Sequence, residues 1–210
     1  MEILIIFFCI TMLIISAVSR IEEYIKMIAI QGFILFLMSI IEFRNIDITH
    51  FIIMVLETLG MKTIIMPMFL MYIVRKNEIT RELEPYLSNF YSLLITTGIY
   101  VAGLFISFWV SGVAQDVRPL HFGLSIATML AAMFIIVNRK KVITHVLGYM
   151  IFENGIFLLS LSMAGEMPII VDLGVMLDLF VGIFLLGIFV EKIQENFDEG
   201  DIDKLSKLRY

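Results

Sequence analysis

Residues 142–165 read VITHVLGYMIFENGIFLLSLSMAG, an apolar run that is interrupted near its middle by one carboxylate, Glu153. A transmembrane helix needs about 20 mostly apolar residues, and this run is long enough to supply them. It is one of a series of such runs, which are separated by short charged segments. The stretch therefore predicts a helix that crosses a bilayer and carries an acid in its middle.

The composition of the whole chain agrees with this interpretation. Of the 210 residues, 60% are hydrophobic and 17% are charged, and the mean hydropathy is +0.98. A soluble domain has roughly 45–50% apolar and about 25% charged residues. The chain has too little polar surface to cover a globule, so we predict an all-α, polytopic integral membrane protein.

Several classes of site have no support in the sequence. No block rich in Lys and Arg indicates nucleic-acid binding, and no phosphate-binding loop, zinc-type spacing or nucleophile triad is present. The single cysteine, Cys9, cannot form a disulfide within the chain and argues against a Cys-ligated metal site. We therefore expect no catalytic residue, no metal site and no bound cofactor in this chain.

The apolar runs predict seven transmembrane helices. Their approximate ranges are 2–19, 25–43, 50–74, 87–110, 120–138, 142–164 and 170–191. If the N-terminus lies outside, twelve of the fifteen basic residues fall in inner segments, whereas only Arg44 and Arg118 fall in outer ones and Lys62 lies within a helix. Cytoplasmic loops carry the excess of Lys and Arg. This asymmetry predicts an outside N-terminus and a cytoplasmic C-terminus.

Three ionisable residues on three predicted helices share one depth. At 1.5 Å per residue, Lys62, Glu153 and Asp178 each lie about 18–20 Å from the inner end of their helix. Each costs roughly 2.5–3.5 kcal/mol to insert at a helix centre, so they are expected to face the bundle interior. Burial favours the neutral form of such groups and a nearby opposite charge favours the charged form. We predict that they form a proton relay, with Glu153 joined to Asp178 directly or through waters; the alternative is that they only tie helices together.

Other ionisable residues are weaker candidates for a secondary relay. Glu57 precedes Lys62 by five residues, which is about 140° around an α-helix, so the two are not expected to share one face. Asp172 is closer to the outer interface, where a solvated helix start is the simpler explanation. His145 is a candidate access point for protons from the cytoplasm toward Glu153, or an interfacial residue.

The predicted third helix contains an irregular stretch, ETLGMKTIIMP, at residues 57–67. Pro67 has no N–H and disturbs the carbonyl four residues before it, at Thr63. The sequence predicts a helix kink that leaves a carbonyl beside Lys62 and admits water. The alternative is that Pro67 only shapes the helix, because prolines are tolerated in transmembrane helices.

The residues that carry this chemistry also carry a resemblance. VLGYMIFENGIFLLSL (146–161), VDLGVMLDLFVGIFLLGIFVEKI (171–193) and GDIDKLSKLRY (200–210) resemble the component E family of group 4 membrane-bound [NiFe] hydrogenases. MKTIIMPMFLMYIVRKN (61–77) is similar to the third helix of that family. Residues 118–210 also resemble the three-helix K subunit of respiratory complex I. That subunit has a glutamate in each of its last two helices. Glu153 matches the first of these positions, and the shorter Asp178 matches the second.

The resemblance implies a division of the chain and a set of partners. Residues 1–117 would be a four-helix N-terminal membrane extension, 118–191 a three-helix module similar to the K subunit, and 192–210 a cytoplasmic tail. The chain would be a non-catalytic membrane-arm subunit in the cytoplasmic membrane of a prokaryote. Its partners would be antiporter-like subunits, the lipid bilayer, and cytoplasmic hydrogenase subunits that hold the [NiFe] centre and iron–sulfur clusters.

Two other functions stay open at the level of the sequence. The chain could be a small K-like subunit of a multisubunit cation/proton antiporter, although the four additional N-terminal helices favour the hydrogenase family. It could also be a purely structural assembly subunit. The transported ion, proton or sodium, is not determined by the sequence.

Overall fold

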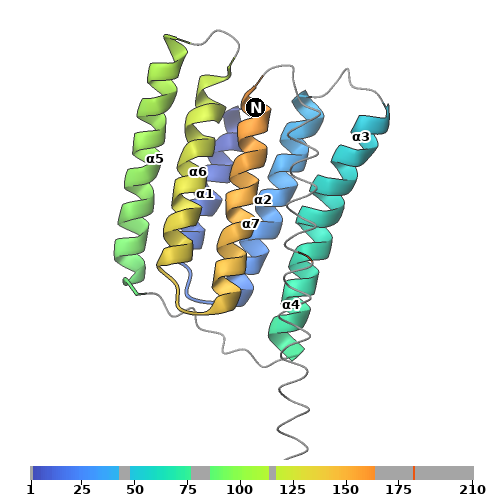
Figure 1. Cartoon of the computed structure of the whole chain (residues 1–210), viewed down its shortest axis with the longest axis vertical. Coiled ribbons are helices and arrows are strands. Elements are labelled where there is room, and N and C mark those ends of the chain that lie inside the picture. Colours follow the sequence, from blue (N-terminus) through green and yellow to red (C-terminus); the bar gives the residue numbers. More distant parts are fainter. Residues whose placement is uncertain (1, 43–47, 77–85, 114–116, 164–181, 183–210) are drawn as a thin grey trace, which may run out of the picture.

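The computed structural model describes residues 2–42, 48–76, 86–113, 117–163 and 182. Helices are the regular elements of these residues (Figure 1). The elements are α1 (Glu2–Ala17), α2 (Ile21–Glu42), α3 (Ile48–Val55), the π-helix η1 (Leu56–Ile65), α4 (Met66–Lys76), α5 (Asn89–Ser111), α6 (Pro119–Val137) and α7 (Val142–Ser162). Since α3, η1 and α4 follow one another without a break, they form one continuous helical span. The first six predicted helices are therefore helical, and the seventh, 170–191, lies outside the described residues.

Five of these spans are long and apolar enough to cross a membrane. They are Ile21–Ile41, Leu56–Lys76, Asn89–Ser111, Pro119–Val137 and Ile143–Ser162. A shorter apolar helix, Glu2–Ala17, joins them. The all-α class is thereby confirmed for the part of the chain that the structure describes. Long apolar helices suit a bilayer because a helix satisfies all its own backbone hydrogen bonds where water is absent.

The helices form a bundle in which neighbours in the sequence run in opposite directions (Figure 1). α6 packs against α5 and α7, α2 packs against α1, α7 and η1, and α1 packs against α5. The α1–α2 and α6–α7 connections lie at one end of the bundle. The beginning of α6 and the end of α7 lie at the other, where the backbone N–H of Arg118 donates to the carbonyl of Ser162 at 2.8 Å.

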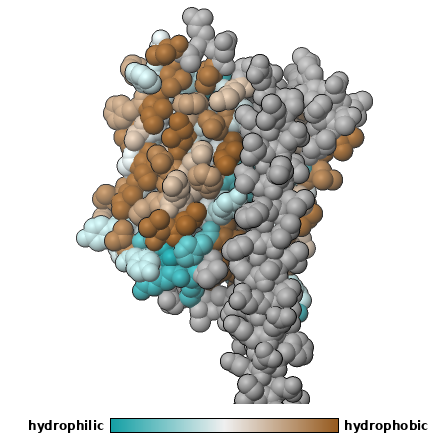
Figure 2. All heavy atoms as spheres, viewed as in Figure 1, coloured by the Kyte–Doolittle hydropathy of each residue, from teal (hydrophilic) through white to brown (hydrophobic). Residues whose placement is uncertain are grey.

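The charged residues are distributed unequally between the two ends of the bundle. The bundle end with the α6–α7 connection, which we call the basic end, carries nearly all the described bases. They are Arg20, Lys26, Arg75, Lys76, Arg139, Lys140 and Lys141, whereas Arg118 belongs to the opposite end. Figure 2 shows a largely hydrophobic face with hydrophilic residues gathered toward the basic end. This distribution is what a bilayer-spanning bundle requires, because apolar side chains face lipid and polar ones face water.

The contact between α5 and α6 is built from small and polar residues. The buried face of α5 consists of Ser92, Thr96, Tyr100, Gly103, Ser107 and Val110. A Cβ on Gly103 would lie 2.7 Å from the carbonyl oxygen of Gly123, and the Tyr100 and Thr128 hydroxyls are 2.8 Å apart. Lipid tails are as apolar as leucine, so membrane helices associate through close backbone approach and hydrogen bonds.

This crossing leads to a stability prediction. A Cβ added at Gly123 would overlap the Gly103 carbonyl oxygen and lie 2.8 Å from the Ser107 Cβ. Gly123→Ala should therefore lower the free energy of unfolding by about 3 kcal/mol, the upper end of the overpacking range. Gly98→Ala is the matched control on α5, because its Cβ would meet no heavy atom within 4 Å. Thermal unfolding in detergent compares the two, and equal midpoints would contradict the observed packing.

Candidate functional site

A buried ion pair joins η1 to α7. The Nζ of Lys62 lies 3.6 Å from Oε1 of Glu153, and their side chains are 4% and 3% exposed. Lys62 is midway along the continuous span from Ile48 to Lys76, and Glu153 is near the middle of α7. Lys62 Nζ also lies 5.2 Å from the centre of the Phe157 ring, one turn further along α7. Two of the three residues predicted to share one depth, Lys62 and Glu153, are therefore in contact.

Lys62 belongs to a π-helix, which the sequence analysis did not predict. In η1 the backbone N–H of Met66 donates to the carbonyl of Met61, and the Thr63 hydroxyl donates to the carbonyl of Thr58 at 2.8 Å. Both bonds span five residues instead of four. π-helices are rare, mostly single turns, and frequently occur at functional sites. The ten-residue length of η1 is thus unusual, and it coincides with the buried ion pair.

The π-helix corrects the expectation for Glu57. That expectation placed Glu57 and Lys62 about 140° apart, which holds for the 3.6-residue turn of an α-helix. In a π-helix, hydrogen bonds close over five residues, so residues five apart lie about one turn apart on the same side. Glu57, Thr58 and Lys62 are accordingly all buried. Glu57 therefore lies one turn beyond Lys62, on the face of η1 that is turned into the protein.

Pro67 lies in the first turn of α4, directly after η1, and is buried. The irregularity that the sequence predicted beside Pro67 takes the form of wide turns over the ten residues before α4. A proline removes the hydrogen bond to the carbonyl four residues earlier. The change from α-helical to π-helical hydrogen bonds in the residues before Pro67 is consistent with the loss of that one hydrogen bond.

α2 completes the surroundings of the ion pair. The side-chain amide of Asn154, the residue after Glu153, donates to Oε1 of Gln31 at 3.2 Å, and both side chains are buried. A Cβ on the next α2 residue, Gly32, would lie 3.0 Å from the Lys62 carbonyl carbon. Glycine is needed here because the backbones of α2 and η1 approach each other at the level of Lys62. We call Gln31, Lys62, Glu153 and Asn154 the central polar cluster.

Gln31 and Asn154 were not predicted as site residues, because only ionisable side chains were taken as candidates from the sequence. A signal was present, since an amide in the middle of an apolar span is itself costly to bury without a hydrogen-bond partner. Gln31 lies near the middle of α2, as Glu153 and Asn154 do in α7. A search for every polar side chain at mid-span depth would have found both.

The other predicted relay residues are placed differently. Asp178 and Asp172 lie outside the described residues, so the expected contact between Glu153 and Asp178 stays a prediction. His145 lies in the first turns of α7, where its Nδ1 is 2.9 Å from the carbonyl oxygen of Lys141. It is eight residues from Glu153, or about 12 Å along the helix axis, so the two side chains are separated by two turns.

The central polar cluster can hold and exchange a proton. An ammonium and a carboxylate that are close together can pass a proton between them and become two neutral groups, with no change in total charge. The Asn154 and Gln31 amides carry both donors and acceptors, so they can hydrogen-bond to either form of a neighbouring group. Among the residues that the structure describes, no group of three His, Cys, Asp or Glu is arranged to hold a metal ion.

Comparison with known proteins gives one distant relative. The chain is 26% identical over 155 residues to the uncharacterized protein Rv0085 of Mycobacterium tuberculosis, a match that covers 73% of this chain and 70% of the relative. No family model matches the sequence, and no solved structure matches it. The matched relative has no described activity, so the chemistry of the site has to be inferred from its own residues.

Proposed function

We propose that the chain is a multi-pass membrane subunit that carries protons through the middle of the bilayer by way of Lys62 and Glu153. The observation that carries this proposal is the buried Lys62–Glu153 ion pair at 3.6 Å, near the centre of two helices of membrane-crossing length. Ionisable residues inside a membrane are rare, and they commonly mark proton relays and ion pathways. Glu57, one π-turn away, and Asp178 would extend the path toward the outer side and across to a neighbouring helix.

The complex that best suits such a subunit is a group 4 [NiFe] hydrogenase. The resemblance of 50–77 and 145–210 to its component E supports this assignment. The chain would contribute part of a proton-conducting axis beside antiporter-like subunits. Redox chemistry at the [NiFe] centre and iron–sulfur clusters would occur in cytoplasmic partner subunits.

The same proposal includes an orientation. Basic residues gather at the end of the bundle that holds the α6–α7 connection, and such residues are retained on the cytoplasmic side. The C-terminus would then be cytoplasmic and the N-terminus outside, in the cytoplasmic membrane of a prokaryote. Seven spans are required for this arrangement, the last of them 170–191.

One observation favours a second candidate function. The Lys62–Glu153 pair links η1 to α7, and the Asn154–Gln31 hydrogen bond links α7 to α2. Three helices are thus joined at one level, which is also what a structural assembly subunit would need. In that case the ion pair would hold the helices in register and would carry no proton.

Affinity purification tests the proposed complex. A tagged chain extracted from its own host membrane in a mild detergent is expected to retain a [NiFe] large subunit and antiporter-like subunits. Mass spectrometry identifies these subunits, and hydrogen evolution with a reduced artificial donor measures the activity of the purified assembly. A complex of antiporter subunits without any hydrogenase subunit or hydrogen turnover would contradict the hydrogenase assignment.

A further inference from the structure

A buried arginine lies at the basic end of the bundle, away from the central polar cluster. Arg139 belongs to the α6–α7 connection and is 2% exposed, with its Cζ 5.9 Å from the centre of the Tyr24 ring. Tyr24 is in the first turn of α2 and is 1% exposed. Within the described part of the chain, Nε and Nη1 of Arg139 and the Tyr24 hydroxyl have no hydrogen-bond partner. Three buried polar atoms that can donate thus gather at one place without an acceptor.

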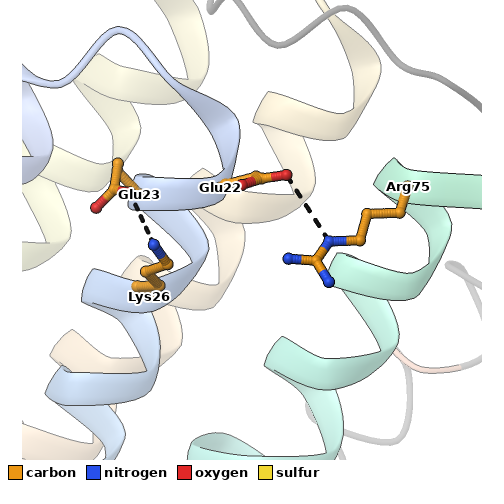
Figure 3. Close-up of polar contacts among 4 residues, drawn as sticks. All are labelled: Glu22, Glu23, Lys26 and Arg75. Atoms are coloured by element: carbon orange, nitrogen blue, oxygen red, sulfur yellow. Dashed lines mark hydrogen bonds and ion pairs between the residues drawn. The ribbon is translucent and has the colours of Figure 1, made fainter.

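The two acids that precede Tyr24, Glu22 and Glu23, are directed to other bases. Figure 3 shows Glu22 turned toward Arg75, with Oε1 3.8 Å from Nε, and Glu23 turned toward Lys26, with Oε1 2.8 Å from Nζ. Neither carboxylate forms an ion pair with Arg139 among the described residues. Glu22 and Glu23 therefore provide no counter-charge for the guanidinium.

The positive charge of Arg139 persists in this position. Burial lowers the pKa of Arg139, and the nearby Tyr24 opposes that change. A guanidinium does not lose its proton in proteins at neutral pH, so Arg139 stays charged. A buried charge without a partner is strongly destabilising. An anion that accepts hydrogen bonds from the guanidinium and the hydroxyl would offset that cost.

We propose that Arg139 and Tyr24 bind the phosphate of an anionic phospholipid in the leaflet at the basic end of the bundle. Arginine binds phosphate oxygens through two parallel N–H donors, and basic pockets between transmembrane helices on the cytoplasmic side bind lipid phosphates. Val137, in the last turn of α6 and two residues before Arg139, is 77% exposed and offers an apolar surface to acyl chains at this end of the bundle. The proposal relies on the membrane location in the proposed function and is independent of the proton relay.

Lipid retention by the purified full chain tests this site. After delipidation in detergent, phosphatidylglycerol is added back and the bound lipid is measured by native mass spectrometry. Arg139→Gln should bind phosphatidylglycerol at least about tenfold more weakly, because it removes one partner of a buried charge pair. Lys140→Gln removes the same charge one residue away at an exposed position, and it should leave retention unchanged. Equal retention by the wild type and Arg139→Gln would overturn the proposal.

Two further arms keep the test decisive. Tyr24→Phe removes a single oxygen and preserves packing, so it can be measured even if Arg139→Gln does not fold. It should weaken the binding of phosphatidylglycerol about threefold. No change in binding would remove Tyr24 from the site.

Inorganic phosphate without lipid distinguishes the source of the oxyanion. If free phosphate binds in an Arg139-dependent way while phosphatidylglycerol is not retained, the lipid assignment is wrong. Cross-linking of residue 139 to a partner polypeptide, again without retained lipid, would also overturn it.

Discussion

Replacing Glu153 with Gln is expected to abolish proton translocation while the complex stays assembled. Glutamine keeps the size and hydrogen bonding of the side chain but cannot carry a proton by ionisation. The rate of proton transfer should fall about a hundredfold, the lower end of what one positioned proton-transfer group contributes. For the proposed hydrogenase complex, the measurement is the proton gradient that membrane vesicles build during hydrogen turnover. It is compared with turnover of the same vesicles with artificial redox partners.

The control for this experiment is the same chemical change at an exposed position. Glu23 pairs with Lys26 at the basic end, with both side chains about half exposed, so Glu23→Gln should leave the gradient intact. If Glu153→Gln builds a normal gradient, Glu153 is not on the path. If the variant complex fails to assemble, the structural role of the Lys62–Glu153 pair is favoured over the relay.

Lys62→Met should have the largest effect on stability and should also reduce ion translocation. It keeps the length of the side chain but leaves Glu153 buried without its cation. Removing one partner of a buried ion pair costs about 3–5 kcal/mol of unfolding free energy. Thermal unfolding of the purified chain in detergent measures the loss. Lys26→Met, which breaks the exposed pair with Glu23, should cost less than about 1 kcal/mol.

A double variant separates direct contact from independent effects. Lys62→Met combined with Glu153→Gln removes both charges of the pair, so neither substitution leaves the other residue as a charge that has lost its partner. Residues in contact show non-additive effects, and we expect the double variant to recover about 2 kcal/mol relative to the sum of the single variants. Additive losses would mean that the 3.6 Å contact contributes nothing to folding.

The helical spans could be predicted from the sequence because a bilayer imposes a simple rule. Its hydrocarbon core requires about 20 apolar residues in a conformation that satisfies its own backbone hydrogen bonds. The predicted range 120–138 corresponds to α6 at Pro119–Val137, and 142–164 corresponds to α7 at Val142–Ser162. The largest difference is at the start of α2, which begins at Ile21 instead of residue 25. The additional first turn contains two acids, Glu22 and Glu23. Negative charges at the N-terminus of a helix interact favourably with the helix dipole, so they stabilise this earlier start.

The depth of the site could be predicted as well, but its partners could not. The helical rise per residue gives the position of a residue along the helix axis. It does not give the direction in which the side chain points across the bundle. The expected contact between Glu153 and Asp178 stays a prediction, because Asp178 lies outside the described residues. The contact that the structure does describe joins Glu153 to Lys62 at 3.6 Å. The contact depends on how α7 and η1 are rotated about their axes, and packing sets that rotation.

By itself, the sequence determined an all-α chain with membrane-length helices and a layer of ionisable residues at mid-span, because hydropathy and helical rise are local properties. The tertiary structure decided the π-helix that turns Glu57 and Lys62 to one side, the approach of Gly32 to the Lys62 backbone, and the position of Arg139 over Tyr24. The last two of these depend on contacts between residues far apart in the chain. Such contacts are chosen by packing and by the cost of burying charge, which no local pattern encodes.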